Sequence, residues 1–165
     1  MSLDTMQSWP FRYTLRCQKR NDLDPTLGTL PDHSLYIGSS NNISARLCFH
    51  FQSDDHGSTF TRQFQPLAVE QLCVMRSRNT KECLKWEDEM VIENMYKFMQ
   101  IFTHPQAWRA VAGGSWAKSN NTRMPFPLQQ KLRTATVKWI NIYSLVSTTV
   151  IFDFFVFGDD SWTSS

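Results

Sequence analysis

The spacing of apolar side chains changes along the chain, and this change restricts the folds that the sequence can adopt. Residues 11–17 alternate apolar or aromatic side chains with polar ones, which is the period of two expected of a β-strand. The short apolar runs at residues 35–38 and 67–75 predict two further strands. Residues 39–51 and 79–102 instead carry apolar side chains at helical spacing. This order of elements predicts an α/β (α+β) domain with a small central antiparallel three-stranded sheet flanked by helices.

Capping and turn residues predict where the two helices begin and end. Ser39 or Ser40 is expected to cap the first helix, because a serine hydroxyl can accept a hydrogen bond from an N–H group of the first turn. Asn79, followed by Glu82, resembles a capping box and predicts the start of the second helix. The dipeptide His104-Pro105 predicts its end.

Length and composition favour one domain in an intracellular protein. The chain has 165 residues and a formal net charge of +2, so any binding of a polyanion must depend on where the charges lie. Its four cysteines are widely separated, which favours free thiols over a zinc site, and the N-terminus lacks the layout of a signal peptide. We expect a domain at residues 11–117, an N-terminal extension at residues 1–10 and a C-terminal extension at residues 118–165.

The C-terminal extension contains an apolar segment that approaches the length of a transmembrane helix. In residues 139–157 the only charged side chain is Asp153. Polar residues in its first half, and β-branched and aromatic residues in its second half, favour a buried strand instead. We therefore expect no membrane span, but a helix from Leu128 and a strand from Thr149. The aromatic residues 150–157 could also form an edge for self-association, which predicts a homo-oligomer.

Charged side chains lie at the margins of both predicted helical faces. On the first helix, Arg46 and His50 lie one turn apart at the edge of the apolar face. On the second, Glu87 and Asp88 flank the apolar stripe on opposite sides, and periodicity does not choose between them. A carboxylate near a buried face needs a cation, hydrogen bonds or a metal ion as its partner. The alternative is that these are ordinary boundary residues whose charged ends reach water or form ion pairs.

Several motifs resemble those of the GIY-YIG nucleases. The run YIGSSNNISARLCFH at residues 36–50 is similar to the second motif and the first helix of that family. Tyr13 stands where the family has a tyrosine on the preceding strand. Residues 83–87 resemble the family's second helix, in which a glutamate follows a small and apolar run, and this favours Glu87 over Asp88. Two further segments resemble a loop and a Gly-Gly segment of one branch of the family: residues 56–62, which precede Pro66, and residues 108–116.

The resemblance implies a DNA endonuclease that uses one divalent cation, Mg²⁺ or Mn²⁺. Glu87 would bind this cation, which would keep most of its waters and contact the scissile phosphate. Arg46 offers a planar guanidinium that matches phosphate oxygens and would stabilise the developing negative charge. A tyrosine, Tyr36 and to a lesser degree Tyr13, would orient or deprotonate the attacking water.

Further residues have supporting roles in this interpretation. His50 would relay a proton or orient Tyr36, because an imidazole titrates near neutral pH. Gly38 would let the backbone turn into the helix and leave space for a phosphate. Two basic clusters near the first and third strands are expected to contact the DNA backbone: Arg16, Lys19 and Arg20, and Arg62, Arg76 and Arg78. No base-reading module is recognisable in the sequence, so homing, restriction and repair roles all remain open.

The sequence departs from the family pattern at both ends of the matching region. Phe11-Arg12 precedes Tyr13 where the family has Gly-Ile, so only the tyrosine carries over. Ala110 and Ala112 occupy positions where the branch has an asparagine and an arginine, and Arg109 is the candidate source of the missing positive charge. One alternative is therefore a nucleic-acid-binding module of the same fold with weakened catalysis. The other is an interaction or membrane-attached protein in which the tail is the working part.

Overall fold

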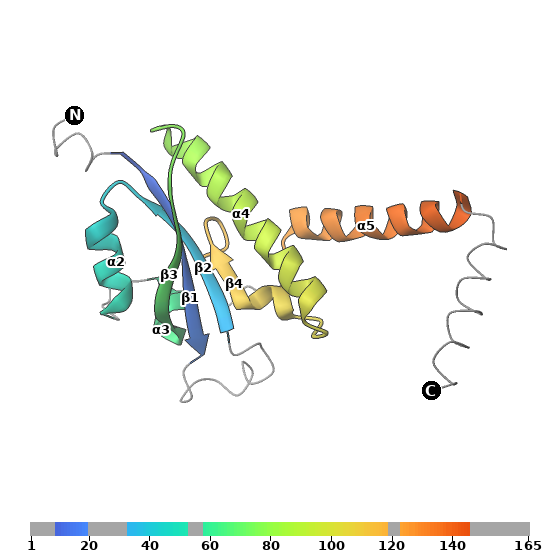
Figure 1. The fold of residues 1–165 in the computed structure, drawn as a ribbon, viewed down its shortest axis with the longest axis horizontal. Helices are drawn as coiled ribbons and strands as arrows, with labels where there is room; N and C mark the ends of the chain where they lie inside the picture. The colour runs from blue at the N-terminus through green and yellow to red at the C-terminus, as the bar shows by residue number, and fades with distance from the viewer. Residues whose placement is uncertain (1–8, 20–32, 53–57, 119–122, 146–165) are drawn as a thin grey trace, which may run out of the picture. The chain divides into compact units, whose positions relative to one another are not determined.

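The computed structural model describes residues 9–19, 33–52, 58–118 and 123–145 (Figure 1). The chain divides into two compact units, residues 1–125 and 126–165, and each is described by itself. In the first unit the described elements follow one another in this order: β1 (Phe11–Lys19), β2 (His33–Ser40), α2 (Ile43–Phe51), α3 (Thr59–Gln63), β3 (Phe64–Val74), α4 (Thr80–Ile101), the 3-10 helix η2 (Ala107–Ala110) and β4 (Val111–Gly113). The described element of the second unit is α5 (Phe126–Leu145).

The four described strands form one sheet in the order β3-β1-β2-β4. β1 is antiparallel to both β2 and β3, which confirms the central antiparallel arrangement predicted from the sequence. The predicted number of three strands is wrong, because β4 pairs in parallel with β2 and adds a fourth. β4 contains only the residues Val-Ala-Gly, and three residues are too few for an apolar period to be recognised.

The two faces of the sheet are covered by different helices (Figure 1). On one face, alternate residues of β1 join a buried cluster, against which Ile43 and Leu47 of α2 pack: Tyr13, Leu15, Cys17, Tyr36, Phe60, Phe64 and Ala112. Within it the rings of Phe60 and Phe64 stack with their centroids 4.4 Å apart. The other face of β1 carries Arg12 and Thr14, which line hollows shared with α4. The period of two along β1 thus separates an apolar core from a polar surface beneath α4.

The helix ends agree with the predictions only in part. α4 is capped by Asn79, whose side chain accepts hydrogen bonds from the N–H groups of Lys81 and Glu82, as expected. α2 is capped by Asn42 and not by Ser39 or Ser40, because β2 continues through Ser40 before the chain turns. The segment preceding β3 was expected to be a loop but contains the short helix α3, whose first N–H groups are capped by Ser58.

The second unit is described only as far as residue 145. α5 begins two residues before the expected Leu128 and confirms a helix in this region. The predicted strand from Thr149 and the aromatic residues 150–157 lie outside the described residues, so the expected self-association edge stays a prediction. Among the described residues, no helix has the length and the apolar character needed to cross a membrane.

Candidate active site

Two aromatic side chains from neighbouring strands meet a histidine from α2 in the core of the first unit. The hydroxyl of Tyr13 lies 2.7 Å from Nε2 of His50. The ring of Tyr36 lies against the same imidazole, with 4.9 Å between the centroids. All three residues are buried, and His50 is completely so. The predicted contact of His50 with Tyr36 is therefore a ring contact, whereas Nε2 of His50 forms a hydrogen bond with Tyr13.

The hydrogen bonds on the other side of the imidazole favour one of its two neutral tautomers. Nδ1 of His50 lies 3.1 Å from Oγ1 of Thr61, and that hydroxyl donates to the carbonyl of Ser58 at 3.1 Å. Because Thr61 gives its own proton to Ser58, it accepts a hydrogen bond from the Nδ1–H group of His50. Nε2 is then unprotonated and accepts a hydrogen bond from Tyr13.

Burial keeps this group of residues uncharged in its resting state. It lowers the pKa of His50 to about 4, with a further contribution from the positive charge of Arg46. This differs from the expectation that the imidazole titrates near neutral pH, because it is enclosed in the core and lies near a cation. Burial also raises the pKa values of Tyr13 and Tyr36 above that of an ordinary phenol, although Arg46 opposes this in both.

Arg46, which lies on α2, interacts with both tyrosines. Its guanidinium forms hydrogen bonds with both Tyr13 and Tyr36. Partial burial lowers the pKa of Arg46, but these hydrogen bonds and the electrostatic interactions with the two phenols outweigh burial, so the pKa is raised. The side chain is only partly buried, which leaves a permanent cation at the border between the tyrosines and solvent.

Glu87 enters the same region from α4. It is 7% exposed, and each of its carboxylate oxygens accepts a hydrogen bond: Oε2 from the hydroxyl of Ser39 and Oε1 from the N–H group of Gly114, both at 2.6 Å. Burial raises the pKa of Glu87, while these two hydrogen bonds lower it. Electrostatic interactions link Glu87 with Arg46 and with both tyrosines, and Arg46 also acts on His50, so Arg46 connects the predicted catalytic residues.

Asp88, which the helical pattern did not separate from Glu87, has a different role. Its carboxylate accepts hydrogen bonds from the N–H group and the hydroxyl of Ser115, at 2.8 and 2.6 Å. These bonds hold the turn after β4 in place. Gly114 lies in that turn with a φ of 48°, a conformation that favours glycine, and an added Cβ would collide with Asp88.

The arrangement around Glu87 fits a divalent cation. A carboxylate has about four lone-pair positions, so two hydrogen bonds orient Glu87 without saturating it. Ligating carboxylates are typically held by such outer contacts. Among the described residues no group of three or more His, Cys, Asp or Glu side chains gathers, so a cation here would keep several waters, as Mg²⁺ does.

Gly38 has a packing role that the sequence did not suggest. A Cβ at this position would lie 2.6 Å from Cζ of Tyr13 and closer still to its hydroxyl. Glycine is therefore needed so that the Tyr13 ring can cross β2 and reach His50. Gly38 is buried, and α2 begins five positions later at Ile43, so the structure gives no direct sign of a phosphate contact.

The basic residues predicted to contact the DNA backbone are spread over the first unit. Arg16 forms an ion pair with Glu70 at 3.6 Å, and exposed Arg62 lies on α3. Arg76 lies over the ring of Trp86. Nη1 of Arg109 donates to Oε1 of Gln106, the residue that precedes η2, at 3.0 Å. Of the remaining three basic residues, Lys19 and Arg78 belong to the described part of the chain, whereas Arg20 lies outside it.

The two alanines that depart from the family pattern are buried. Ala110 is fully buried in η2, and Ala112 lies next to Tyr36 through the parallel pairing of β4 with β2. Neither methyl group can supply a hydrogen bond or a charge. The resting network around Tyr36 therefore relies on Arg46 and Ser58.

Four supporting groups were not identified as site residues from the sequence: Ser39, Ser58, Thr61 and the N–H group of Gly114. Ser39 follows the Tyr-Ile-Gly run directly, but it was interpreted as a helix cap. Ser58 and Thr61 lie in the segment that resembles a family loop, which was the only signal for them. A backbone N–H group has no sequence signal.

Comparison with known proteins gives one match. The family model described as the GIY-YIG catalytic domain matches residues 13–95, about half of the chain. Searches of curated proteins and of solved structures give no match.

Proposed function

The chain belongs to the GIY-YIG family of nucleases, and from this premise we propose that it is an endonuclease that hydrolyses DNA phosphodiester bonds with a single divalent cation. The observation that carries the proposal is the convergence of β1, β2, α2 and α4 on one site. Tyr13, Tyr36, Arg46 and His50 form a connected group there, and Glu87 provides an oriented carboxylate.

Glu87 is the residue proposed to hold the cation, which is Mg²⁺ or Mn²⁺. A bound divalent cation would neutralise charge on the phosphate and stabilise the leaving oxygen. Ser39 and Gly114 fix the orientation of the carboxylate, so that its free lone pairs remain available.

Arg46 is proposed to stabilise the negative charge that develops on the phosphate oxygens when phosphorus becomes five-coordinate in the transition state. Its guanidinium is already held by the two tyrosine hydroxyls, so little reorganisation is needed when negative charge develops nearby. A lysine would keep the charge but lose the planar set of donors that matches phosphate oxygens.

The attacking water must lose a proton as its oxygen bonds to phosphorus and the bond from phosphorus to the leaving oxygen breaks. A neutral tyrosine can accept that proton only if its own proton moves to another group. Tyr13 has such an acceptor in Nε2 of His50, which has a pKa of about 4 in the resting site and must become more basic as negative charge develops on the phosphate nearby. The described partners of Tyr36, Ser58 and Arg46, are a hydroxyl and a cation. We therefore assign the proton transfer to Tyr13 and His50, and the positioning of water to Tyr36, which reverses the order of importance expected from the sequence.

Nicking of supercoiled plasmid in Mg²⁺ or Mn²⁺ tests the proposed function. Glu87→Gln should reduce the rate by roughly 100-fold or more, since the loss of a metal ligand removes several kcal/mol of transition-state stabilisation. Asp88→Asn is the matched control, because an asparagine oxygen can still accept the hydrogen bond from the Ser115 N–H group. Equal activity of the wild-type protein and Glu87→Gln would contradict the proposal.

A weakened nucleic-acid-binding module is the second candidate, and the buried Ala112 beside Tyr36 is the observation that favours it. The same experiment separates the two. DNA binding without nicking in either metal, unchanged by Glu87→Gln, would assign the chain to binding alone.

A further inference from the structure

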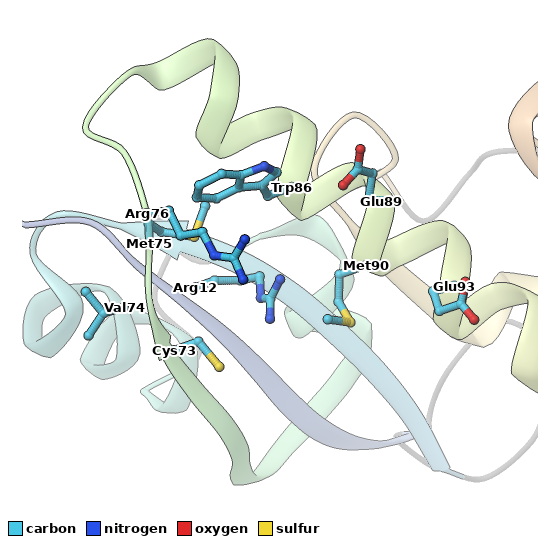
Figure 2. A pocket seen from close by; sticks show the side chains of 9 residues that line it. All are labelled: Arg12, Cys73, Val74, Met75, Arg76, Trp86, Glu89, Met90 and Glu93. Atoms are coloured by element: carbon cyan, nitrogen blue, oxygen red, sulfur yellow. The ribbon is translucent and has the colours of Figure 1, made fainter.

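A cavity of about 550 Å³ lies between β1, the end of β3 and α4, on the face of the sheet beneath that helix (Figure 2). This volume falls within the range of small-ligand pockets. Its wall combines cationic, aromatic and acidic side chains, chiefly those of Arg12, Arg76, Trp86, Glu89, Met90 and Glu93. None of them belongs to the group of residues assigned to hydrolysis.

The cavity adjoins the carboxylate proposed to hold the cation. Arg12 is the cross-strand partner of Ser39, and the hydroxyl of Ser39 donates to Glu87. Trp86 precedes Glu87 on α4, and it lines the cavity while Glu87 turns toward the site. A DNA strand with one phosphate at Glu87 would therefore place a neighbouring nucleotide near this cavity.

The cavity has an aromatic platform beside two cations. Figure 2 shows the guanidinium groups of Arg12 and Arg76 on the side of the cavity next to Trp86. Cζ of Arg76 lies 5.9 Å from the centre of the Trp86 ring, at the outer limit of a cation–π contact. Stacking a flat base between them needs about 7 Å, two carbon contacts of about 3.5 Å each, which a small outward movement of the exposed Arg76 would provide.

The acidic residues distinguish between ligands of different chemistry. Glu89 and Glu93 lie farther along α4 from the two arginines (Figure 2), and Glu89 forms an ion pair with Lys85 at 4.0 Å. Carboxylates at this end would repel an acidic peptide. They would accept hydrogen bonds from the amino groups of a nucleobase, and the arginines at the other end would bind its phosphate.

We infer that this cavity binds an unpaired nucleotide next to the scissile phosphate, with its base stacked on Trp86 and its phosphate held by Arg12 and Arg76. The inference rests on the proposed function and specifies its substrate. A base within a duplex is covered on both faces by its neighbours and cannot stack on Trp86. The preferred substrate is therefore DNA with an unpaired nucleotide at the cleavage position.

The test uses the full chain in EDTA, so that DNA is bound without being cut. The probe is a duplex with a single-stranded overhang that carries 2-aminopurine, and the same duplex without overhang is the reference. The wild-type protein should bind the overhang duplex more tightly and quench its fluorescence. Trp86→Ala should weaken this binding by about 5- to 150-fold and abolish quenching, because stacking on an aromatic side chain contributes about that much. Trp86→Phe should retain most of both.

Charge is tested with one matched pair of variants. Arg12→Gln should weaken binding of the overhang duplex, whereas Lys81→Gln, which removes the same charge from an exposed position in the first turn of α4, should not. Thermal unfolding of each variant checks that the fold is intact. Unchanged binding and quenching in folded Trp86→Ala would overturn the inference. Displacement of the DNA by a polyglutamate peptide, dependent on Arg12, would assign the cavity to an acidic peptide instead.

Plasmid nicking in Mg²⁺ by the same preparations tests the nuclease separately. Nicking together with overhang binding that does not depend on Trp86 overturns only the cavity assignment. Trp86-dependent binding without nicking overturns only the nuclease. Absence of both binding and nicking overturns both.

Discussion

Tyr13 and Tyr36 are the same kind of residue on adjacent strands, yet their surroundings differ in a way that affects proton transfer. Tyr13 donates a hydrogen bond to an unprotonated imidazole nitrogen, whereas the ring of Tyr36 packs against the same imidazole at a tilt of 56°. Raised pKa values of both phenols mean that neither is ionised in the resting protein at neutral pH. The difference between them lies in the available proton acceptor.

We predict that Tyr13→Phe lowers the rate of plasmid nicking more than Tyr36→Phe. Loss of a general base typically costs 10²- to 10⁴-fold, whereas loss of a positioning hydroxyl costs less. Single-turnover nicking at saturating Mg²⁺ measures both variants, and circular dichroism checks their folding. A larger loss in Tyr36→Phe would return the main role to Tyr36.

The burial of His50 also predicts how stability depends on pH. In the unfolded chain a histidine titrates at about 6.5, whereas the pKa of folded His50 is about 4. Between these values the unfolded state binds the additional proton, so the contribution of His50 is complete above pH 6.5 and is lost as the pH falls toward 4. The loss is on the order of 3 kcal/mol, at about 1.4 kcal/mol per unit.

Urea unfolding between pH 4 and 7.5 measures this dependence. His50→Gln should flatten it, while His33→Gln, the matched change at an exposed histidine, should leave it as in the wild-type protein. The difference between the two curves isolates His50 from the carboxylates that also titrate in this range. If the free energy of unfolding depends on pH equally in His50→Gln and in the wild-type protein, the imidazole of His50 is not held neutral.

At the scale of elements, the site depends on where strands end more than on the strands themselves. β2 ends at Ser40, and its last residues project to opposite sides. The hydroxyl of Ser39 reaches Glu87, and that of Ser40 accepts a hydrogen bond from Asn42 before α2 begins. The turn after β4 supplies Gly114 from the other side. Residues at the ends of two strands, β2 and β4, thus hold the carboxylate of Glu87.

We predict that Ser39→Ala raises the Mg²⁺ concentration needed for half-maximal nicking by about 10- to 100-fold, the usual effect of removing a partner of a metal ligand. The rate at saturating Mg²⁺ should change much less. Ser40→Ala is the matched control, since it removes the same hydroxyl from the adjacent residue without touching Glu87. An equal shift in both variants would show that the effect reflects the strand end and not the ligand.

The bounds of the strands and helices show which of them could be predicted from the sequence pattern. β1 and α4 were predicted closely because each has a long periodic pattern, and α4 has a capping asparagine. α2 was predicted, but its cap was assigned to serines that belong to β2. β4 and α3 were missed because short elements are stabilised by their neighbours more than by their own residues.

At the scale of the whole molecule, the first unit contains every residue assigned to the site. Its strands between residues 11 and 113 form one sheet, and its helices cover the faces of that sheet. The family match lies entirely within this unit. Net charge contributes little, because the chain carries a formal charge of only +2. In the proposed function, DNA binding would therefore depend on a few placed cations such as Arg46, Arg12 and Arg76.

We predict that a chain ending at Pro125 folds cooperatively and nicks plasmid at a rate within about threefold of the full chain, because units with their own core can fold alone. Size-exclusion chromatography, thermal unfolding and nicking assays measure this. A folded but inactive 1–125 chain would show that residues 126–165 contribute to function. A change in oligomeric state on truncation would support the predicted self-association through the tail.

The sequence by itself determined the class of fold, the main strands and helices, and the residue types of the candidate site. These features depend on local period and on motif spacing, which are properties of neighbouring residues in the chain. Only the tertiary structure showed the different partners of Glu87 and Asp88, paired His50 with Tyr13, added β4 to the sheet and placed the Trp86 cavity beside the site. The physical reason is that each of these depends on contacts between distant segments, whose geometry and burial no local pattern contains.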